Sequence, residues 1–420
     1  MMMKEILSKR LGIKDLIKLF LLFSLFIPRS FDETLRVDLT GMQFNISRLG
    51  FSVEELYVHK SVYLFDILLF LFFLFIFFRR RLKLPKWFIV YVTLLIFIFV
   101  NSIIIGANIS WGVGGLIEYM RLPVIVLLVC YSERNKQERN ILLDLIFIMF
   151  FLGIWGIIRF SFFYNIYNYN RLDTIGFSSN LFSQLNAILF PLVVIGFNNI
   201  KLRNIFFFIS LVMLMAILLA GSRQGYLMFL LFLISYLMII LRSKDKRKFL
   251  TILSLIILPI LIFYNFKKLQ LFPTLRIVEY GLYDLNRIEL AYGALKMWRM
   301  SPIWGIGPGN FLIKWGSIST LPSVYSYYWH PHNLYLMFLS ETGIVGVSTF
   351  LWLLSKAIRA CWFEYKFENS KLALSLGLAL IIFLFGGFFD YILWDYRTTV
   401  VIGILIGVSI SLFKKKYVSN

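Results

Sequence analysis

Charged residues are scarce in this sequence of 420 residues: Asp, Glu, Lys and Arg make up 15%, whereas 60% of residues are hydrophobic and Phe alone occurs 45 times. A soluble domain of ordinary composition is about one quarter charged and closer to half apolar. Apolar runs of about 17–25 residues, long enough to cross a bilayer, recur along the chain. They do not show the short alternating segments of a transmembrane barrel. The sequence therefore predicts an all-α polytopic integral membrane protein.

Cysteine is almost absent as well, with two residues, Cys130 and Cys361. Both lie near helix ends that we expect on the cytoplasmic side, so we expect no disulfide. The N-terminal stretch "KEILSKRLGIKDLIKLFLLFSLFIP" has no small-residue cleavage site. It is therefore interpreted as a basic cytoplasmic tail and a first span rather than a cleaved signal peptide.

Hydropathy predicts about twelve transmembrane helices. They lie near residues 12–28, 61–78, 87–106, 112–131, 141–160, 180–197, 204–220, 225–241, 249–265, 332–354, 372–389 and 398–413. Every second connection is basic, as in "RRRLKLPK", "RSKDKRK" and the tail "KKKYVSN". Basic loops are retained in the cytoplasm, so an even number of spans with both termini cytoplasmic satisfies the positive-inside rule. The formal net charge of +21 thus indicates membrane topology rather than nucleic-acid binding.

Three regions follow from this topology. Residues 1–265 hold helices 1–9 with outer loops near 29–60 and 161–179, the first with the alternation of a small hairpin. Residues 266–331 form one long outer loop, and residues 332–420 hold helices 10–12 and the basic tail. We find no internal repeat, which argues against a transporter built from repeats.

The long outer loop is basic, which the positive-inside rule does not predict. An anionic ligand at the outer face would explain this excess, but long loops also cross membranes largely regardless of charge. "DLNRIELAYGALKMWRMSPIWGIGPGNF" predicts an amphipathic helix that ends at Ser301-Pro302 and is followed by a Gly-rich turn. "GIGPG" lacks the third glycine and the preceding strand of a dinucleotide-binding fingerprint.

A few charges fall within or beside the predicted spans. Arg223 lies in the turn "LLAGSRQGYLMF", and Glu118 and Arg121 are three residues apart on one helix face, where we expect them to pair with each other. Arg397 lies in the connection "FFDYILWDYRT" with two aspartates. A charged side chain near the bilayer interior costs free energy, so it marks a functional site by default. An arginine at a helix end has a simpler explanation, because its long side chain can extend to the polar membrane interface.

Two of the three histidines stand together where the tenth span begins. His332 and Asn333 open this span in "HPHNLYLMFLSETGIVG". A histidine at a helix mouth can take a proton from a hydroxyl near neutral pH, although a lone histidine at a helix start is more often a structural hydrogen-bonding group. Arginines suit phosphate oxygens and keep their charge. One base with several arginines suits a particular reaction. In this reaction an acceptor hydroxyl attacks a sugar whose leaving group is a lipid pyrophosphate.

These residues resemble the signature of the O-antigen ligase/polymerase superfamily. The signature is His, then Asn, Ser or Gln, nine arbitrary residues and Gly-x-x-Gly, which His332, Asn333, Gly343 and Gly346 match in full. "GSRQGYL" is similar to the family's arginine between two central spans, and "NRIELAYGALKMWRMSPIWGIGPGNF" to its long periplasmic loop.

The resemblance implies a fold of the lipid-linked-sugar glycosyltransferase type in a bacterial inner membrane. His332 would activate an acceptor hydroxyl, and Arg223 and Arg287 would hold the pyrophosphate of an undecaprenyl-pyrophosphate-linked glycan at the periplasmic face, with inversion. Secondary candidates for substrate binding are Arg121, Arg276, Arg299, Asn333 and Arg397. No cofactor is expected, and no metal, because the outer loops show no cluster of Asp and Glu.

Several functions remain open on this scaffold. An O-antigen ligase transfers the glycan to lipid A–core oligosaccharide, and the single late loop with the polar "FFDYILWDYRT" favours this function. A polymerase of the Wzy type would instead extend lipid-linked repeat units. A protein O-oligosaccharyltransferase usually carries a further C-terminal extension and ranks third. A transporter of lipid-linked sugars would need charges accessible from both faces, whereas the candidate charges here concentrate on the outer side.

Overall fold

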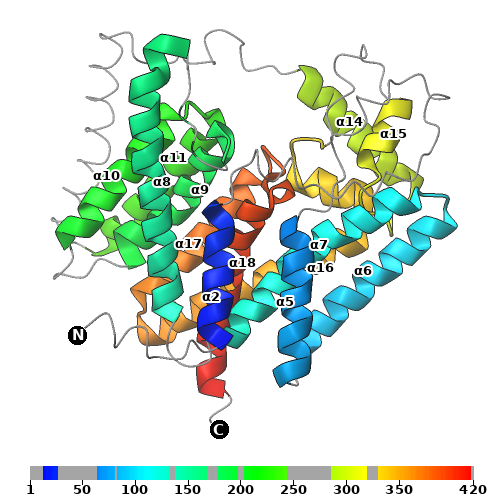
Figure 1. Cartoon of the computed structure of the whole chain (residues 1–420), viewed down its shortest axis with the longest axis horizontal. Coiled ribbons are helices and arrows are strands. Elements are labelled where there is room, and N and C mark those ends of the chain that lie inside the picture. The colour runs from blue at the N-terminus through cyan, green and yellow to red at the C-terminus, as the bar shows by residue number, and fades with distance from the viewer. Residues whose placement is uncertain are drawn as a thin grey trace.

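The computed structural model describes residues 13–26, 64–80, 83–132, 138–167, 172, 174, 177–196, 203–243, 285–318 and 330–417. Over these residues the chain is almost entirely helical (Figure 1). The extended pairing within the described part is a single bridge between Thr174 and Phe177. The all-α class that the composition predicts is therefore confirmed for this part of the chain.

The described part of the chain forms a series of helices. Their bounds are α2 Ile13–Phe23, η1 Ser24–Phe26, α5 Leu64–Arg80, α6 Lys86–Ile104, α7 Ile109–Ser132, α8 Glu138–Tyr167, α9 Ser179–Pro191, η4 Leu192–Gly196, α10 Arg203–Leu219, α11 Arg223–Ser243, α14 Leu285–Met300, α15 Phe311–Ile318, α16 Leu334–Glu368, α17 Lys371–Gly386, η7 Ile392–Trp394 and α18 Tyr396–Tyr417.

Most predicted spans coincide with one of these helices. The predicted span near 249–265 and the predicted hairpin near 29–60 lie outside the described residues. Two helices extend beyond the expected ends of their spans: α8 continues to Tyr167, into the region of the expected loop near 161–179, and α16 continues to Glu368, past the expected end near 354. Neither stretch contains Pro or Gly to stop the helix. Asn369 ends α16 in the left-handed conformation, with φ 51°, and Ser370 caps α17 through a hydrogen bond from the backbone N–H of Ala373.

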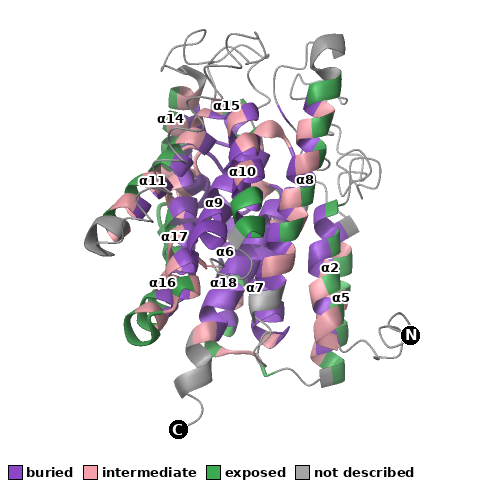
Figure 2. Ribbon diagram, turned by 90° about the vertical axis from the view of Figure 1, so that its left-hand side faces the viewer, coloured by how far each residue is buried: buried purple, intermediate pink, exposed green. Residues whose placement is uncertain are grey.

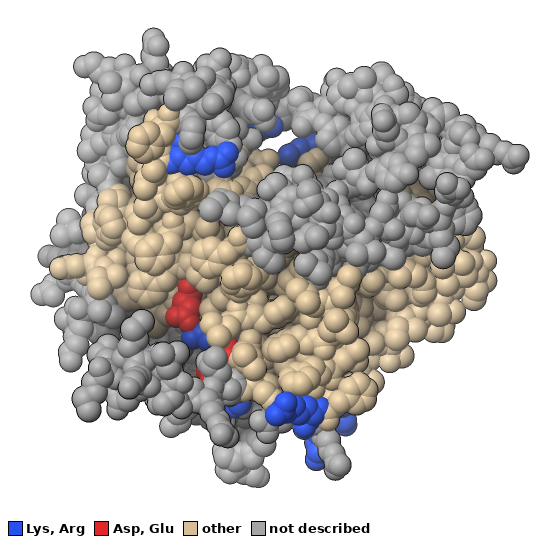
Figure 3. Space-filling view, in the orientation of Figure 1, with Lys and Arg blue, Asp and Glu red and all other residues tan. Residues whose placement is uncertain are grey.

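Five of the described helices are long and apolar enough to cross a membrane, and four shorter apolar helices accompany them. The five are Lys86–Ile104, Trp111–Ser132, Ile141–Phe162, Ser179–Gly196 and Leu334–Glu368. In Figure 3 most of the described surface carries no charged side chain, and the Lys and Arg side chains gather mainly toward its upper and lower edges. These features are those of a membrane protein with several spans.

Helices α7, α9 and α18 form the centre of the bundle, and their side chains are buried over most of their length (Figure 2). Gly403 and Gly407 of α18 face α7, where a Cβ atom would lie 2.6 Å from Ile125 and from Val129 respectively. Two glycines four residues apart let helix backbones approach closely, which is a common way to associate helices in lipid.

Helix α16 is interrupted near its start, at Gly343, whose φ of 63° and ψ of −167° are not helical. The segment after α14 fills this interruption. The backbone N–H groups of Ile306 and Gly307 donate to the carbonyls of Ser340 and Glu341, while Ile344 N–H donates to Pro302 O. A Cβ at residue 343 would lie 2.3 Å from the carbonyl oxygen of Ile303. The first glycine of the signature is therefore required by backbone packing.

The fully buried carboxylate of Glu341 holds the Gly-rich turn in place. It accepts hydrogen bonds from the backbone N–H of Gly309 at 2.8 Å, from the backbone N–H of Phe311 at 2.9 Å, and from the hydroxyl of Tyr119 at 3.1 Å. Three donors compensate for burying an acidic side chain. The Gly-rich turn is thus joined to the start of α16.

Candidate functional site

The candidate site lies where α16 begins and α17 ends. Nδ1 of His332 is 3.1 Å from Oδ1 of Asp390, and the His332 side chain is one quarter exposed. Asn333 fixes this entry to the helix, because its side chain accepts from Leu336 N–H and donates to the Phe388 carbonyl. An ionised aspartate can only accept, so the neutral imidazole of His332 carries its proton on Nδ1 and the lone pair on Nε2.

His332 is held in a backbone conformation that few side chains adopt, with φ 48°. Its N–H donates to Nδ1 of His330 at 3.1 Å, and the two imidazole rings lie 4.3 Å apart. Non-glycine residues at positive φ cost free energy and concentrate at functional sites, where the surrounding structure maintains them. Here His330 and Asp390 together fix both the backbone and the ring of His332.

The carboxylate of Asp390 has further partners in its buried surroundings. Tyr391 N–H donates to Oδ1 at 2.9 Å, and the Gln184 amide donates to Oδ2 at 3.3 Å and to the side chain of Gln224. Burial alone would raise the pKa of Asp390. The hydrogen bond from His332, the charges of the two histidines and the hydrogen bond from Gln184 outweigh it and lower the pKa to about 2. Asp390 is therefore an anion at any physiological pH.

Arg287 is the predicted arginine that the structure brings to this site. It lies in the first turn of α14, and its Nη1 donates to the carbonyl of Phe389 at 3.0 Å, one residue before Asp390. Arg299 lies at the other end of the same helix and is exposed. Twelve residues of helix separate the two by about 18 Å. Arg276 lies outside the described residues.

Arg223 is the first residue of α11 and is partly buried. The next residue, Gln224, donates to the Gly386 carbonyl at 2.8 Å and accepts from Gln184. At Gly225 a Cβ would lie 1.9 Å from Oγ of Ser183, so α11 begins in direct contact with α9. These contacts place Arg223 at the same end of the bundle as Asp390.

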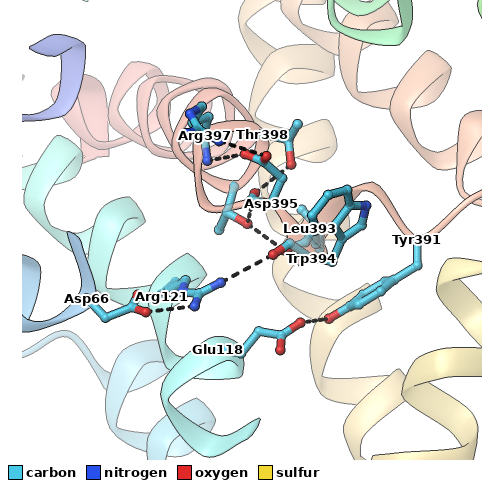
Figure 4. Close-up of polar contacts among 10 residues, drawn as sticks. Asp66, Glu118, Arg121, Tyr391, Leu393, Trp394, Asp395, Arg397 and Thr398 are labelled. Carbon is cyan, nitrogen blue, oxygen red and sulfur yellow. Dashed lines mark hydrogen bonds and ion pairs between the residues drawn. The ribbon is translucent and has the colours of Figure 1, made fainter. Parts of the chain in front are cut away.

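Arg121 and Arg397 are both buried in ion pairs: Arg121 pairs with a carboxylate of another helix, and Arg397 pairs with the residue just before its own helix (Figure 4). Two nitrogens of Arg121 lie 2.5 and 2.7 Å from the carboxylate oxygens of Asp66, and Arg397 lies 3.0 Å from Asp395. Arg121 thus pairs with Asp66 of α5 and not, as we expected from the sequence, with Glu118. Glu118 instead accepts a hydrogen bond from the Tyr391 hydroxyl at 2.8 Å. A contact from another helix cannot be deduced from spacing within one helix.

Three titratable side chains of the site form a group of potential metal ligands. His330, His332 and Asp390 each offer one ligand atom, and these atoms lie within 4.8 Å of one another. The sequence predicts no metal on the ground that acidic clusters are missing from the outer loops. The structure instead assembles a mixed group, two histidines from one segment and one aspartate from another.

Several residues of the site were not predicted as site residues. Asp390 stands in a polar turn that composition alone does not distinguish, and Gln184 and Gln224 look like isolated polar residues in apolar spans. Uncharged polar side chains facing the bundle interior are a weak signal that could have drawn attention to the two glutamines. Their meeting at Asp390 is decided by the packing of α9, α11 and α17.

Together, the apolar helices and a cluster of one histidine and two arginines define a multi-pass membrane protein with a polar site at one end of the bundle. Residues 208–351 match the model of the O-antigen ligase family. This match to one part of the chain supports the resemblance drawn from the signature. The matched stretch includes Arg223, Arg287 and His332. No curated protein matches the sequence.

Proposed function

We propose that this protein is an O-antigen ligase. It transfers a glycan from undecaprenyl pyrophosphate to the lipid A–core oligosaccharide at the periplasmic face of the inner membrane, with inversion and without a metal cofactor. The family match supports the ligase or polymerase type of reaction. The observation that carries the proposal is the meeting of His332, Asp390 and Arg287 at one end of the bundle.

His332 is the general base in this mechanism. Its Nε2 removes the proton from the acceptor hydroxyl as the oxygen attacks the anomeric carbon, and Asp390 stabilises the imidazolium that forms. The bond from the anomeric carbon to the pyrophosphate oxygen breaks on the opposite side of the sugar. A single displacement of this kind inverts the anomeric centre.

Arg287 and Arg223 bind the pyrophosphate. Fixed guanidinium groups stabilise the charge that accumulates on the leaving group, and they act most strongly where water is excluded. Arg121 and Arg397 stabilise the structure instead, because each is buried against a carboxylate. Asn333 positions His332 through the helix cap.

An assay of the purified protein with an undecaprenyl-pyrophosphate glycan tests the proposal. Lipid A–core is added to one reaction and omitted from a second, both without metal. Transfer only in the first reaction, and its loss in His332→Ala, is the expected result. A ladder of longer lipid-linked glycans in the second reaction would replace the ligase with a polymerase. Absence of product in both, with competent substrates, would favour a protein acceptor or a transporter.

A further inference from the structure

The group formed by His330, His332 and Asp390 has the composition of a transition-metal site. Two imidazoles and one carboxylate are ligands that zinc accepts, whereas magnesium and calcium prefer oxygen ligands alone. Among the described residues, this is the one group of three His, Cys, Asp or Glu side chains gathered closely enough to bind an ion. The group is largely buried, and the partly exposed His332 ring leaves a route from the solvent.

The geometry is close to that of a three-ligand zinc site. Tetrahedral zinc with bonds of about 2.0–2.1 Å keeps neighbouring ligand atoms about 3.3 Å apart. Nδ1 of His332 and Oδ1 of Asp390 are already 3.1 Å apart, and the ligand atoms of all three side chains lie within 4.8 Å of one another. Small side-chain movements therefore suffice for binding, and the fourth position remains open to water.

We propose that His330, His332 and Asp390 bind a zinc-class divalent ion and that the bound ion blocks the base function of His332. The binding part stands on the geometry alone, and the inhibitory part rests on the proposed function. The ion takes the place of the proton between Nδ1 of His332 and Asp390. A neutral imidazole then carries its single proton on Nε2, where it can no longer accept a proton from the acceptor hydroxyl.

Asp390 supplies the negative charge that an ion needs at this site, and Arg287 opposes it. The Arg287 side chain donates to the Phe389 carbonyl beside Asp390, so its charge weakens the binding of a cation. The site is therefore expected to bind zinc reversibly rather than as a permanent structural ion. Such an ion would inhibit the enzyme at raised concentration and would be removed by a chelator.

Cobalt binding to the full chain in detergent tests the site without any substrate. The visible absorption of tetrahedral Co²⁺ and equilibrium dialysis with Zn²⁺ should give one bound ion per chain. His330→Gln keeps an acceptor for His332 N–H but removes an imidazole, and it should weaken binding at least about tenfold. His59→Gln removes the third histidine of the chain and serves as the control, with binding unchanged. Equal binding by the wild type and His330→Gln would overturn the proposal.

Inhibition is measured as the ratio of transfer activity in zinc to that in chelator, so that each variant is its own reference. Wild type and His59→Gln should be inhibited at the same zinc concentration, and His330→Gln should need at least about tenfold more. Equal inhibition of all three would mean that zinc acts on the pyrophosphate substrate, which overturns the inhibitory part. If no transfer is found at all, the proposed function fails while the binding experiment still decides the site.

Discussion

Nδ1 of His332 lies 3.1 Å from Oδ1 of Asp390, although 58 residues separate them in the sequence. The contact joins the start of α16 to the connection after α17, and it fixes the orientation of the imidazole ring that we propose as the base. A carboxylate that fixes the tautomer of a catalytic histidine also stabilises the cation formed on proton transfer.

Replacing Asp390 by Asn should lower the rate of glycan transfer. The amide no longer stabilises the imidazolium, and it can present an N–H to the imidazole and reverse the tautomer. By analogy with the same change in Ser-His-Asp triads, we expect kcat to fall about 10²–10⁴-fold with little change in KM. Steady-state kinetics across a pH series measures both constants. A loss confined to KM would show that Asp390 acts in binding instead.

Asp390 should also make stability depend on acid pH. Its pKa is about 2 in the folded chain against an ordinary value of 3.8. A lowered pKa stabilises the fold above about pH 4, and this stabilisation, about 2 kcal/mol, disappears as the pH falls from about 4 toward 2. Thermal unfolding in detergent should show this loss in the wild type and not in Asp390→Asn. Parallel curves for the two proteins over this range would contradict the assignment.

Gly343→Ala should destabilise the protein by about 3 kcal/mol or more. An alanine meets a backbone conformation that is essentially restricted to glycine, and its Cβ meets the Ile303 carbonyl at 2.3 Å. Gly377 offers a matched control in α17, because a Cβ there meets Cys361 at 3.4 Å, an ordinary contact. Gly377→Ala should change stability by no more than about 1 kcal/mol. Comparison of the two melting temperatures measures the difference, and equal effects would rule out a specific role for residue 343.

Arg287→Ala should reduce kcat/KM about 10²–10³-fold, as expected for the loss of a charged donor at a leaving group. Arg299→Ala, on the exposed end of the same helix, provides the control and should retain most of the activity. The two variants are compared at equal donor concentration after their folding has been checked. If Arg299→Ala proved the more damaging, the pyrophosphate contact would belong to the far end of α14.

Breaking the buried pair between Asp66 and Arg121 should destabilise the fold without a specific effect on the reaction. Arg121→Met leaves a buried carboxylate without its bidentate partner, which typically costs about 3–5 kcal/mol. Adding Asp66→Asn in the same chain should recover much of the loss, because no uncompensated charge then remains. Thermal unfolding of the two single variants and the double variant measures the coupling. Additive losses would mean that the pair makes no net contribution.

The sequence by itself determined the membrane class, the positions of most of the described helices and the residues of the signature. These features follow from local properties: an apolar run long enough for a bilayer is visible in any window, and the His332 signature depends on spacing along one segment. The helix that ends at Met300 was also predictable, because Ser301-Pro302 and the glycines after it stop a helix locally.

Only the tertiary structure decided which of these residues meet. Arg121 pairs with Asp66 of α5 rather than with Glu118 on its own helix, and Asp390 comes to His332 through the packing of α16 against α17. Gly343 appears in the sequence as a motif residue, and its physical role emerges when the turn after α14 enters the interrupted helix. Spacing along a chain specifies neighbours on one helix, whereas contacts between helices depend on how whole helices pack, which no single segment encodes.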